Sequence, residues 1–321
     1  MQMSREELLR VYRAMRTIRA FEERLHLEFA TGEIPGFVHL YAGEEASAVG
    51  VCMHLTERDK IASTHRGHGH CIAKGVEVPG MMSEIYGRKD GVCGGKGGSM
   101  HIADLSKGML GANGIVGGGP PLICGAALAA KVLKTGGVAV AFYGDGASNQ
   151  GTTLESLNLA TIWNLPAIFV CEDNGYAEAT SSSYSVGGSQ AKRAEGFGMP
   201  CHEVDGFDFF AVHEAAGIAI ERARDGGGPS MLHVKLARYY GHFEGDATTY
   251  RAPGEVDRIR AEQDCLQRFR ARVLEAALLE SGDFAAVDQA VAEEMEVAVR
   301  AAKAAPPPGE ADLLADVYVA Y

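Results

Sequence analysis

The chain has 321 residues, of which 46% are hydrophobic, and a formal net charge of −12 at pH 7. A chain of this size buries about three quarters of the surface that it exposes when unfolded, so a large core is expected. The acidic balance and the lack of any run of five basic residues argue against nucleic acid or an anionic membrane as the main partner.

Three features predict a soluble, cytoplasmic protein. Residues 1–29 are rich in Arg and Glu and lack the apolar core of a signal peptide, and no apolar stretch reaches the 18 residues of a membrane-spanning helix. The seven Cys are scattered and form no Cys-x-x-Cys pair, which is typical of reduced intracellular thiols.

The chain is expected to begin with an amphipathic helix over residues 4–30. Apolar residues recur there at helical spacing, and Ser4 with Glu7 forms the pattern of a capping box. Thr31 and Gly32 end this helix, and a second helix is predicted over residues 43–55.

The middle of the chain alternates between strand and helix patterns. A short run at residues 60–63 and continuous apolar runs at residues 138–143, 167–171 and 231–236 are predicted strands. Helices are predicted between them at residues 122–134, 152–163 and 208–225. Because uninterrupted apolar strands are covered on both faces, the pattern predicts an α/β fold with a doubly wound, mainly parallel sheet.

After residue 253 the composition changes to that of helices rich in Ala, Glu and Arg. Helices are predicted over residues 256–280 and 283–304, and three prolines at 306–308 then break the chain before a short tail. Three parts are expected: an N-terminal helical segment at 1–55 that packs on the core, an α/β core at 56–252, and C-terminal helices with a tail at 253–321.

Polar motifs follow two of the predicted strands. One strand runs into Gly144-Asp145-Gly146, and the next runs into Asn174. Ligands of parallel α/β sheets bind beyond such strand ends, and the helix after the first motif offers free N–H groups to an anion. Asp145, Asn174 and a carbonyl near Tyr176 offer the oxygen ligands that Mg²⁺ prefers. Either motif alone is also typical of a turn, but their position on consecutive strands favours a site for a magnesium-bound diphosphate.

A histidine cluster follows the first predicted strand. His65, Arg66, His68 and His70 lie in one short segment. Three histidines could hold zinc, whereas the arginine would repel a cation and bind phosphate through two parallel hydrogen bonds. The segment alone leaves an anion site, a zinc site and surface histidines without a role as alternatives.

Glycine is dense between residues 87 and 119, which predicts long functional loops. The segment 94–101 contains Lys96 but lacks the Gly-x4-Gly-Lys-Ser/Thr spacing of a nucleoside triphosphatase loop. The segment 111–117 either offers its backbone to a flat heterocycle or is a flexible linker. His242 follows the last predicted strand, so it is expected on the same rim as the two polar motifs.

Taken in order, these motifs resemble a known family. They read Thr-His-Arg-Gly-His-Gly at 64–69, Gly-Lys-Gly-Gly-Ser-Met-His at 95–101, Gly-Ala-Asn-Gly-Ile-Val-Gly at 111–117, Gly-Asp-Gly-Ala-Ser-Asn-Gln-Gly at 144–151, Glu-Asp-Asn-Gly-Tyr at 172–176 and Tyr-Gly-His at 240–242. The chain resembles the α subunit of the thiamine-diphosphate-dependent first component of 2-oxo-acid dehydrogenase complexes. Within that family, residues 34–45 and 239–246 are most similar to acetoin dehydrogenase α subunits.

The resemblance implies a thiamine-diphosphate-binding fold of the diphosphate-binding type, with helical extensions at both ends. It also implies residue roles. The Mg²⁺ ligands would be Asp145, Asn174 and the Tyr176 carbonyl. The diphosphate would be held by His65, Arg66 and the amides of Gly146 and Ala147. The aminopyrimidine edge would be bound by the backbone of Gly114 and Val116, and the carbonyl adduct would be oriented or protonated by His242.

The sequence departs from the family that it resembles at three positions. Pyruvate-type relatives carry Tyr in place of His65, and either side chain can donate a hydrogen bond to phosphate. Asp173 stands where Asn is common, which adds a negative charge near the metal. Phe243 stands where mitochondrial pyruvate relatives carry a phosphorylated serine, so that control is absent.

The resemblance implies a reaction and partners as well. The chain would be active only with a β subunit, which carries the activating glutamate, in a heterotetramer of two α and two β chains. It would cleave acetoin to acetaldehyde and pass the acetyl unit to lipoyl groups of an acyltransferase component. Pyruvate or a branched 2-oxo acid is the alternative substrate.

Two other classes of protein compete with this interpretation. A histidine-cluster metallohydrolase that uses His65, His68 and His70 is a remote alternative. An NAD-binding Rossmann protein would need a third glycine where Asn149 stands.

Overall fold

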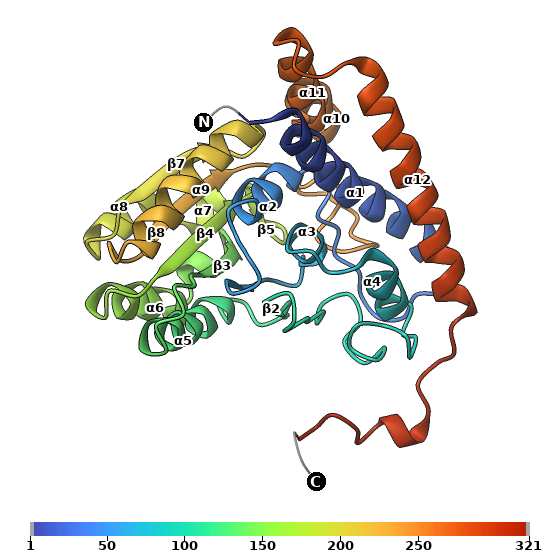
Figure 1. The fold of residues 1–321 in the computed structure, drawn as a ribbon, viewed down its shortest axis with the longest axis horizontal. Coiled ribbons are helices and arrows are strands. Elements are labelled where there is room, and N and C mark those ends of the chain that lie inside the picture. The colour runs from blue at the N-terminus through green and yellow to red at the C-terminus, as the bar shows by residue number, and fades with distance from the viewer. Residues whose placement is uncertain (1–2, 319–321) are drawn as a thin grey trace.

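The core of the molecule is a parallel sheet. The computed structural model describes residues 3–318, and within them six strands pair in the order β2, β1, β3, β4, β8, β7, every neighbouring pair parallel (Figure 1). The strands are β1 Lys60–Ala62, β2 Met109–Gly111, β3 Ala139–Gly144, β4 Ala167–Asp173, β7 Cys201–Asp205 and β8 Ser230–Lys235. The predicted doubly wound, mainly parallel α/β sheet is confirmed.

Helices cover both faces of the sheet, because side chains along each strand alternate between two cores. In β3, Val140 and Phe142 belong to one core, and the small Ala139 and Ala141 belong to the other. The covering helices are α5 Gly119–Val132 and α6 Gly151–Ile162 on one face, and α2 Glu45–Cys52 and α9 Phe209–Arg224 on the other. This double coverage explains why the strand sequences lack polar alternation.

Helices from the two ends of the chain pack beside this core. α1 Arg5–Phe29 begins at the predicted capping box of Ser4 and Glu7, and α12 Ser281–Ala304 runs alongside it (Figure 1). The shorter helices α3 His68–Ala73 and α4 Val78–Ile85 contact α1 and α12 respectively.

A buried ion cluster joins three of these helices. Arg19 of α1 donates to both carboxylate oxygens of Glu45, at 2.5 and 3.0 Å, and to Asp264 at 2.7 Å. Glu45 opens α2, and Asp264 precedes α11 Cys265–Glu275. Arg19 therefore fixes the start of α2, and with it the loop that leads into α2, against the outer helices.

The prediction of one helix over residues 256–280 is wrong. This segment forms α10 Glu255–Gln263 and α11 Cys265–Glu275, separated by Asp264 in an extended conformation with φ −64° and ψ 120°. The Asp264 carboxylate accepts a hydrogen bond from the Gln267 amide at 3.0 Å in addition to its bond from Arg19. The helix breaks because this aspartate caps α11 and completes the ion cluster.

Several short elements were not predicted. Besides β2, β7, α3 and α4, they are the hairpin of β5 Tyr176–Ala177 and β6 Thr180–Ser181, the helices α7 Ser182–Ser185 and α8 Gln190–Gly196, and the 3-10 turns η1 Ala147–Asn149 and η2 Glu310–Asp312. β7 has no apolar strand pattern, because it is an edge strand with a half-exposed, polar sequence. The predicted helix at residues 43–55 is also shorter at both ends. Among residues 3–318, no helix has the length and apolarity needed to cross a membrane.

Candidate functional site

A cavity of about 340 Å³ lies at the carboxyl ends of β1, β3 and β4. The strand order reverses between β1 and β3, and such a switch point is where open α/β sheets bind ligands. Every site residue predicted from the sequence lines this cavity: His65, Arg66, Gly114, Val116, Asp145, Gly146, Ala147, Asn174, Tyr176 and His242. The structure brings these positions together, and their individual roles stay predictions.

Asp145 presents a buried carboxylate oxygen to this cavity. The residue is 2% exposed, and its Oδ2 has no hydrogen-bond partner in the described part of the chain. Burial and, next, the Asp173 carboxylate raise the pKa of Asp145 to about 6, although the amides of Asp145 and Gly146 oppose the shift. Leaving a buried polar atom unpaired costs free energy, so this oxygen is suited to a ligand, above all a hard cation.

Asn174 is held by its neighbours. Its Nδ2 donates to Glu44 Oε1 at 2.9 Å, and its Oδ1 accepts from the Tyr176 amide at 3.3 Å. Gly175 between them has a φ of +87°, a left-handed conformation that glycine adopts without strain. The Tyr176 carbonyl accepts a hydrogen bond from Arg238 at 3.4 Å and has a second lone pair for another ligand.

The backbone at Gly146 lies close to a neighbouring strand. A Cβ atom at this position would lie 2.7 Å from the Cβ of Ala177, closer than side chains tolerate. Glycine is therefore required here on steric grounds alone. The next residue, Ala147, opens the turn η1 that leads into α6.

Arg66 joins two loops at the cavity wall. Its Nη1 donates to the Leu40 carbonyl at 2.5 Å and its Nη2 to the His242 carbonyl at 2.9 Å. A guanidinium has five N–H donors, so others remain for an anion. Burial and then the Arg66 charge lower the pKa of His65 to about 2, so His65 is neutral and offers a hydrogen bond rather than a charge.

The alternative of a zinc site formed by His65, His68 and His70 does not hold. His68 is buried between Glu22 and Ser99, at 3.0 and 2.9 Å, and His70 is buried between Ser63 and Glu172, at 2.7 and 3.1 Å. Both ring nitrogens of each histidine are thus already bonded to protein. The reason is local: residues 68 and 70 lie two apart on α3 and cannot face the same point.

The glycine-rich loop is filled by the protein's own carboxylate. Glu84 accepts hydrogen bonds from the amides of Cys93 and Gly95 at 2.8 Å, Gly97 at 2.7 Å and Gly98 at 3.1 Å. Converging amides make an anion cradle, and here Glu84 occupies it. This agrees with the prediction that the loop is not that of a nucleoside triphosphatase.

Other residues that were not predicted also line the cavity, among them His39, Glu44, Glu172 and Arg238. Burial and then the Glu172 charge raise the pKa of Glu44 to about 8. Arg238 is buried and lies three residues after the end of β8, so the strand-end argument could have found it. His39 and Glu44 lie on the segment between α1 and α2, where no strand end marks them.

Comparison with known proteins decides the family. Residues 13–310 match the model of the dehydrogenase E1 component. The chain belongs to the dehydrogenase E1 component family. The resemblance inferred from the motifs is confirmed, and with it the class of enzyme, a thiamine-dependent oxidoreductase component. Family membership implies thiamine diphosphate as the cofactor.

Relatives match the chain over almost its whole length. The α subunits of acetoin:2,6-dichlorophenolindophenol oxidoreductase from Cupriavidus necator and Bacillus subtilis are 65% and 54% identical, each over 99% of this chain and 96% of the relative. The α subunit of the pyruvate dehydrogenase E1 component from Rhizobium meliloti is 38% identical over 98% of this chain and 90% of the relative. Because these relatives are α subunits, a partner subunit is implied.

Proposed function

We propose that this chain is the α subunit of an enzyme that cleaves acetoin to acetaldehyde and passes the acetyl unit to lipoyl groups of an acyltransferase. Thiamine diphosphate and Mg²⁺ are the cofactors, and two β subunits complete a heterotetramer with two copies of this chain. Acetoin is proposed as the substrate because the two acetoin oxidoreductase α subunits are 65% and 54% identical to this chain, whereas the pyruvate dehydrogenase relative is 38% identical.

The cavity fits the proposed metal and diphosphate. Asp145, Asn174 and the Tyr176 carbonyl form an oxygen-only donor set, as Mg²⁺ requires, and the unpartnered Asp145 Oδ2 supports it. The diphosphate is assigned to His65 and Arg66 with the amides of Gly146 and Ala147. The aminopyrimidine edge is assigned to the backbone of Gly114 and Val116. When bound, thiamine diphosphate supplies the carbanion chemistry that breaks the carbon–carbon bond.

His242 is the proposed catalytic residue of this chain. Both main-chain polar groups of His242 are hydrogen-bonded. The amide donates to Asp246 at 2.6 Å, and the carbonyl accepts from Arg66. Its side-chain Nδ1 is buried without a hydrogen-bond partner in residues 3–318. Burial and then Arg66 lower the pKa of His242 to about 4, so a neutral ring lines the cavity. A neutral imidazole can orient a carbonyl or move a proton to it.

The surroundings of the cavity favour an uncharged substrate. His39, His65 and His242 are neutral at pH 7, because burial and Arg66 lower the pKa of each. Arg66 and Arg238 both donate to main-chain carbonyls. The three neutral imidazoles offer hydrogen bonds rather than positive charge to a bound hydroxyketone.

A reductive-acetylation assay tests this function. The co-expressed α and β chains are supplied with a lipoyl domain and with acetoin, pyruvate and a branched 2-oxo acid in parallel. We expect kcat/KM for acetoin to exceed the others by more than about tenfold, which corresponds to roughly 1.4 kcal/mol of transition-state binding. Equal or faster acetylation from pyruvate would reassign the substrate and leave the thiamine-dependent class intact.

A further inference from the structure

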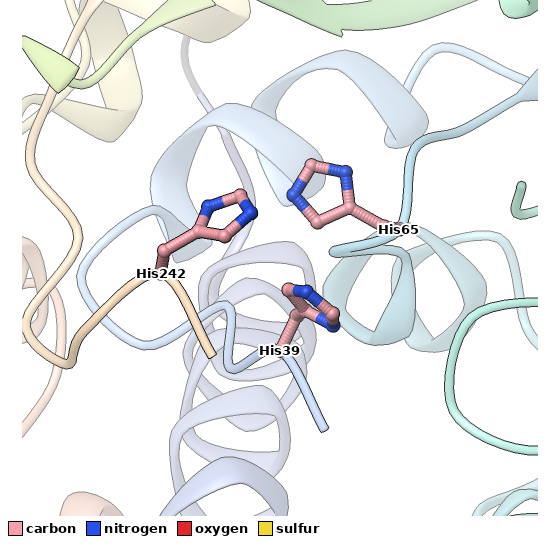
Figure 2. A group of neighbouring side chains, drawn as sticks. All are labelled: His39, His65 and His242. Carbon is pink, nitrogen blue, oxygen red and sulfur yellow. The ribbon is translucent and has the colours of Figure 1, made fainter. Parts of the chain in front are cut away.

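Three histidines from separate segments face one another across one side of the cavity. His39 lies on the segment before α2, His65 follows β1, and His242 lies on the loop after β8 (Figure 2). Their ring centroids are 4.7, 5.1 and 5.0 Å apart. One nitrogen of each ring lies within 4.8 Å of a nitrogen of both others. We call this group the histidine trio.

The trio differs from His68 and His70 in its hydrogen bonding. Nδ1 of His39 and Nδ1 of His242 are buried, and neither has a partner in the part of the chain that the structure describes. By contrast, His68 and His70 are bonded at both nitrogens. Buried polar atoms are normally paired, so two unpaired nitrogens in one group point to a ligand.

The trio is in the protonation state that a metal requires. Burial, followed by the charge of Arg66, lowers the pKa of His39 to about 3, of His65 to about 2 and of His242 to about 4. All three rings are neutral at pH 7, and neutral imidazole is the form that binds a metal ion.

The spacing of the rings suits a tetrahedral ion. A Zn–N distance of about 2.0–2.1 Å places ligand nitrogens roughly 3.4 Å apart and ring centroids roughly 5 Å apart. The observed centroid distances of 4.7 to 5.1 Å already match, so rotation of the rings is the main adjustment needed. Imidazole is a preferred ligand of zinc, whereas Mg²⁺ prefers oxygen, so the trio differs in chemistry from the Asp145 site.

The charges of Arg66 and Arg238 oppose a cation here, and the Asp246 carboxylate offsets part of this repulsion. Arg66 and Arg238 direct hydrogen bonds to the carbonyls of Leu40, His242, Tyr240 and Glu178. The Asp246 carboxylate accepts from the His242 amide, and hydrogen bonds from Tyr250 and that amide outweigh burial and lower the pKa of Asp246 to about 2. A full negative charge therefore stands beside the trio at pH 7.

We propose that His39, His65 and His242 form a binding site for a zinc-class divalent ion, with water as the fourth ligand. The ion uses ring nitrogens of His65 and His242 that the proposed function assigns to the diphosphate and to the substrate. Zinc is therefore an inhibitor of this enzyme, acting inside the cofactor cavity but not at the magnesium ligands. The site itself does not depend on the proposed function, because it is formed by the protein alone.

Cobalt(II) is the probe that tests the site. It is titrated into the α–β complex after removal of thiamine diphosphate and Mg²⁺ with a chelator. We expect one equivalent per α chain with the intense visible absorption of tetrahedral cobalt, no cobalt–thiolate band, and displacement by Zn²⁺. The weak spectrum of octahedral cobalt, or a thiolate band from a cysteine site, would overturn the proposal.

Two variants and a control assign the signal. His65→Tyr keeps a ring and a hydrogen-bond donor but removes a ligand, and His39→Gln removes another. Each should weaken cobalt binding at least about 100-fold, because loss of even an outer partner of a metal ligand costs 10- to 100-fold. His54→Gln changes a histidine outside the trio, paired with His213 at 3.2 Å, and should bind cobalt like the parent protein. Equal affinity in all three variants would contradict the assignment.

Failure of this inference and failure of the proposed function are distinguishable. Magnesium-dependent binding of thiamine diphosphate without a tetrahedral cobalt signal would remove the zinc site alone. A tetrahedral cobalt signal without cofactor binding would remove the proposed function alone.

Discussion

Two carboxylates at neighbouring strand ends, Asp145 and Glu172, have opposite surroundings. Glu172 accepts hydrogen bonds from Tyr41 at 2.5 Å, Ser47 at 2.7 Å and His70 at 3.1 Å. Burial opposes its ionisation, but His70 and the two hydroxyls hold the pKa of Glu172 below its usual value. Asp145 has a buried oxygen that no described residue satisfies. Glu172 is therefore bound within the protein, and Asp145 is open to a ligand.

At the same scale, His242→Ala separates catalysis from binding. The main-chain hydrogen bonds of residue 242 do not depend on the side chain, so the loop should keep its conformation. We expect the α–β complex to retain thiamine diphosphate and to lose about 10²- to 10⁴-fold in turnover, the usual contribution of a general acid or base. Steady-state acetylation of a lipoyl domain measures this. Turnover within twofold of the parent enzyme would show that His242 has no catalytic role.

The residues that the sequence predicts share one signal. Asp145, Asn174 and His242 each follow an apolar strand, and the carboxyl ends of parallel strands converge. His39 and Glu44 carry no such signal, because a tertiary contact brings them to the cavity from between two helices. The sequence places His68 and His70 next to His65, but it does not show that both lie on helix α3 with their side chains buried in the core.

At the scale of elements, the Arg19 cluster locks α1, α2 and α11 together. Arg19→Met leaves the carboxylates of Glu45 and Asp264 buried without a counter-charge. Breaking such a pair from one side costs about 3–5 kcal/mol of unfolding free energy. Denaturant unfolding of the full chain measures it. The control is Arg13→Met, which removes an exposed pair with Glu294 and should cost less than about 1 kcal/mol. Equal losses in the two variants would contradict the structural role of Arg19.

A second contact between elements gives a pH dependence. Glu28 of α1 pairs with Arg24 at 2.7 Å, with Tyr86 after α4 at 2.7 Å and with Lys303 of α12 at 2.8 Å. Burial opposes ionisation of Glu28, but these three partners outweigh it and lower its pKa from 4.5 to about 2. A lowered folded-state pKa means that the stabilisation is complete above pH 4.5 and is lost as the pH falls through about 2.

The variant Glu28→Gln removes this titration. We expect its unfolding free energy to lie below that of the parent chain at pH 6, and the difference to shrink steadily between about pH 4.5 and 2. Thermal unfolding across that range measures both proteins. A difference that stays constant with pH would show that the ionised form of Glu28 is not what stabilises the packing of α1, α4 and α12.

Helices and strands with a strong local sequence pattern are predicted correctly, and those fixed by distant contacts are not. β3, β4 and β8 are continuous apolar runs, and their positions are within two residues of prediction. The break at Asp264 depends on Arg19, 245 residues away in sequence, so no local pattern reports it. The short β2 lies in a glycine-rich loop and is fixed by pairing with β1 rather than by its own sequence.

At the scale of the whole molecule, one wall of the cavity is left exposed by this chain. Ile115 and Val116 lie at its wall and are 74% and 52% exposed. Large apolar side chains beside a cofactor cavity suit a surface that another subunit covers. These exposed side chains are expected if a β subunit, which is predicted to carry the activating glutamate, covers the cavity. The division of this chain into three parts at residues 55 and 252 also stays a prediction.

Binding of thiamine diphosphate to the reconstituted α–β complex tests the central claim most directly. Thermal unfolding is compared with and without the cofactor and Mg²⁺, for the parent α chain and for Asp145→Ala. A ligand at about 100 times its Kd stabilises a protein by roughly 2.7 kcal/mol. We predict such a shift, dependent on Mg²⁺, for the parent complex, and none for Asp145→Ala, whose unfolding temperature without cofactor should be at least that of the parent because a buried, unpaired oxygen is removed. An undiminished shift in Asp145→Ala would contradict the account.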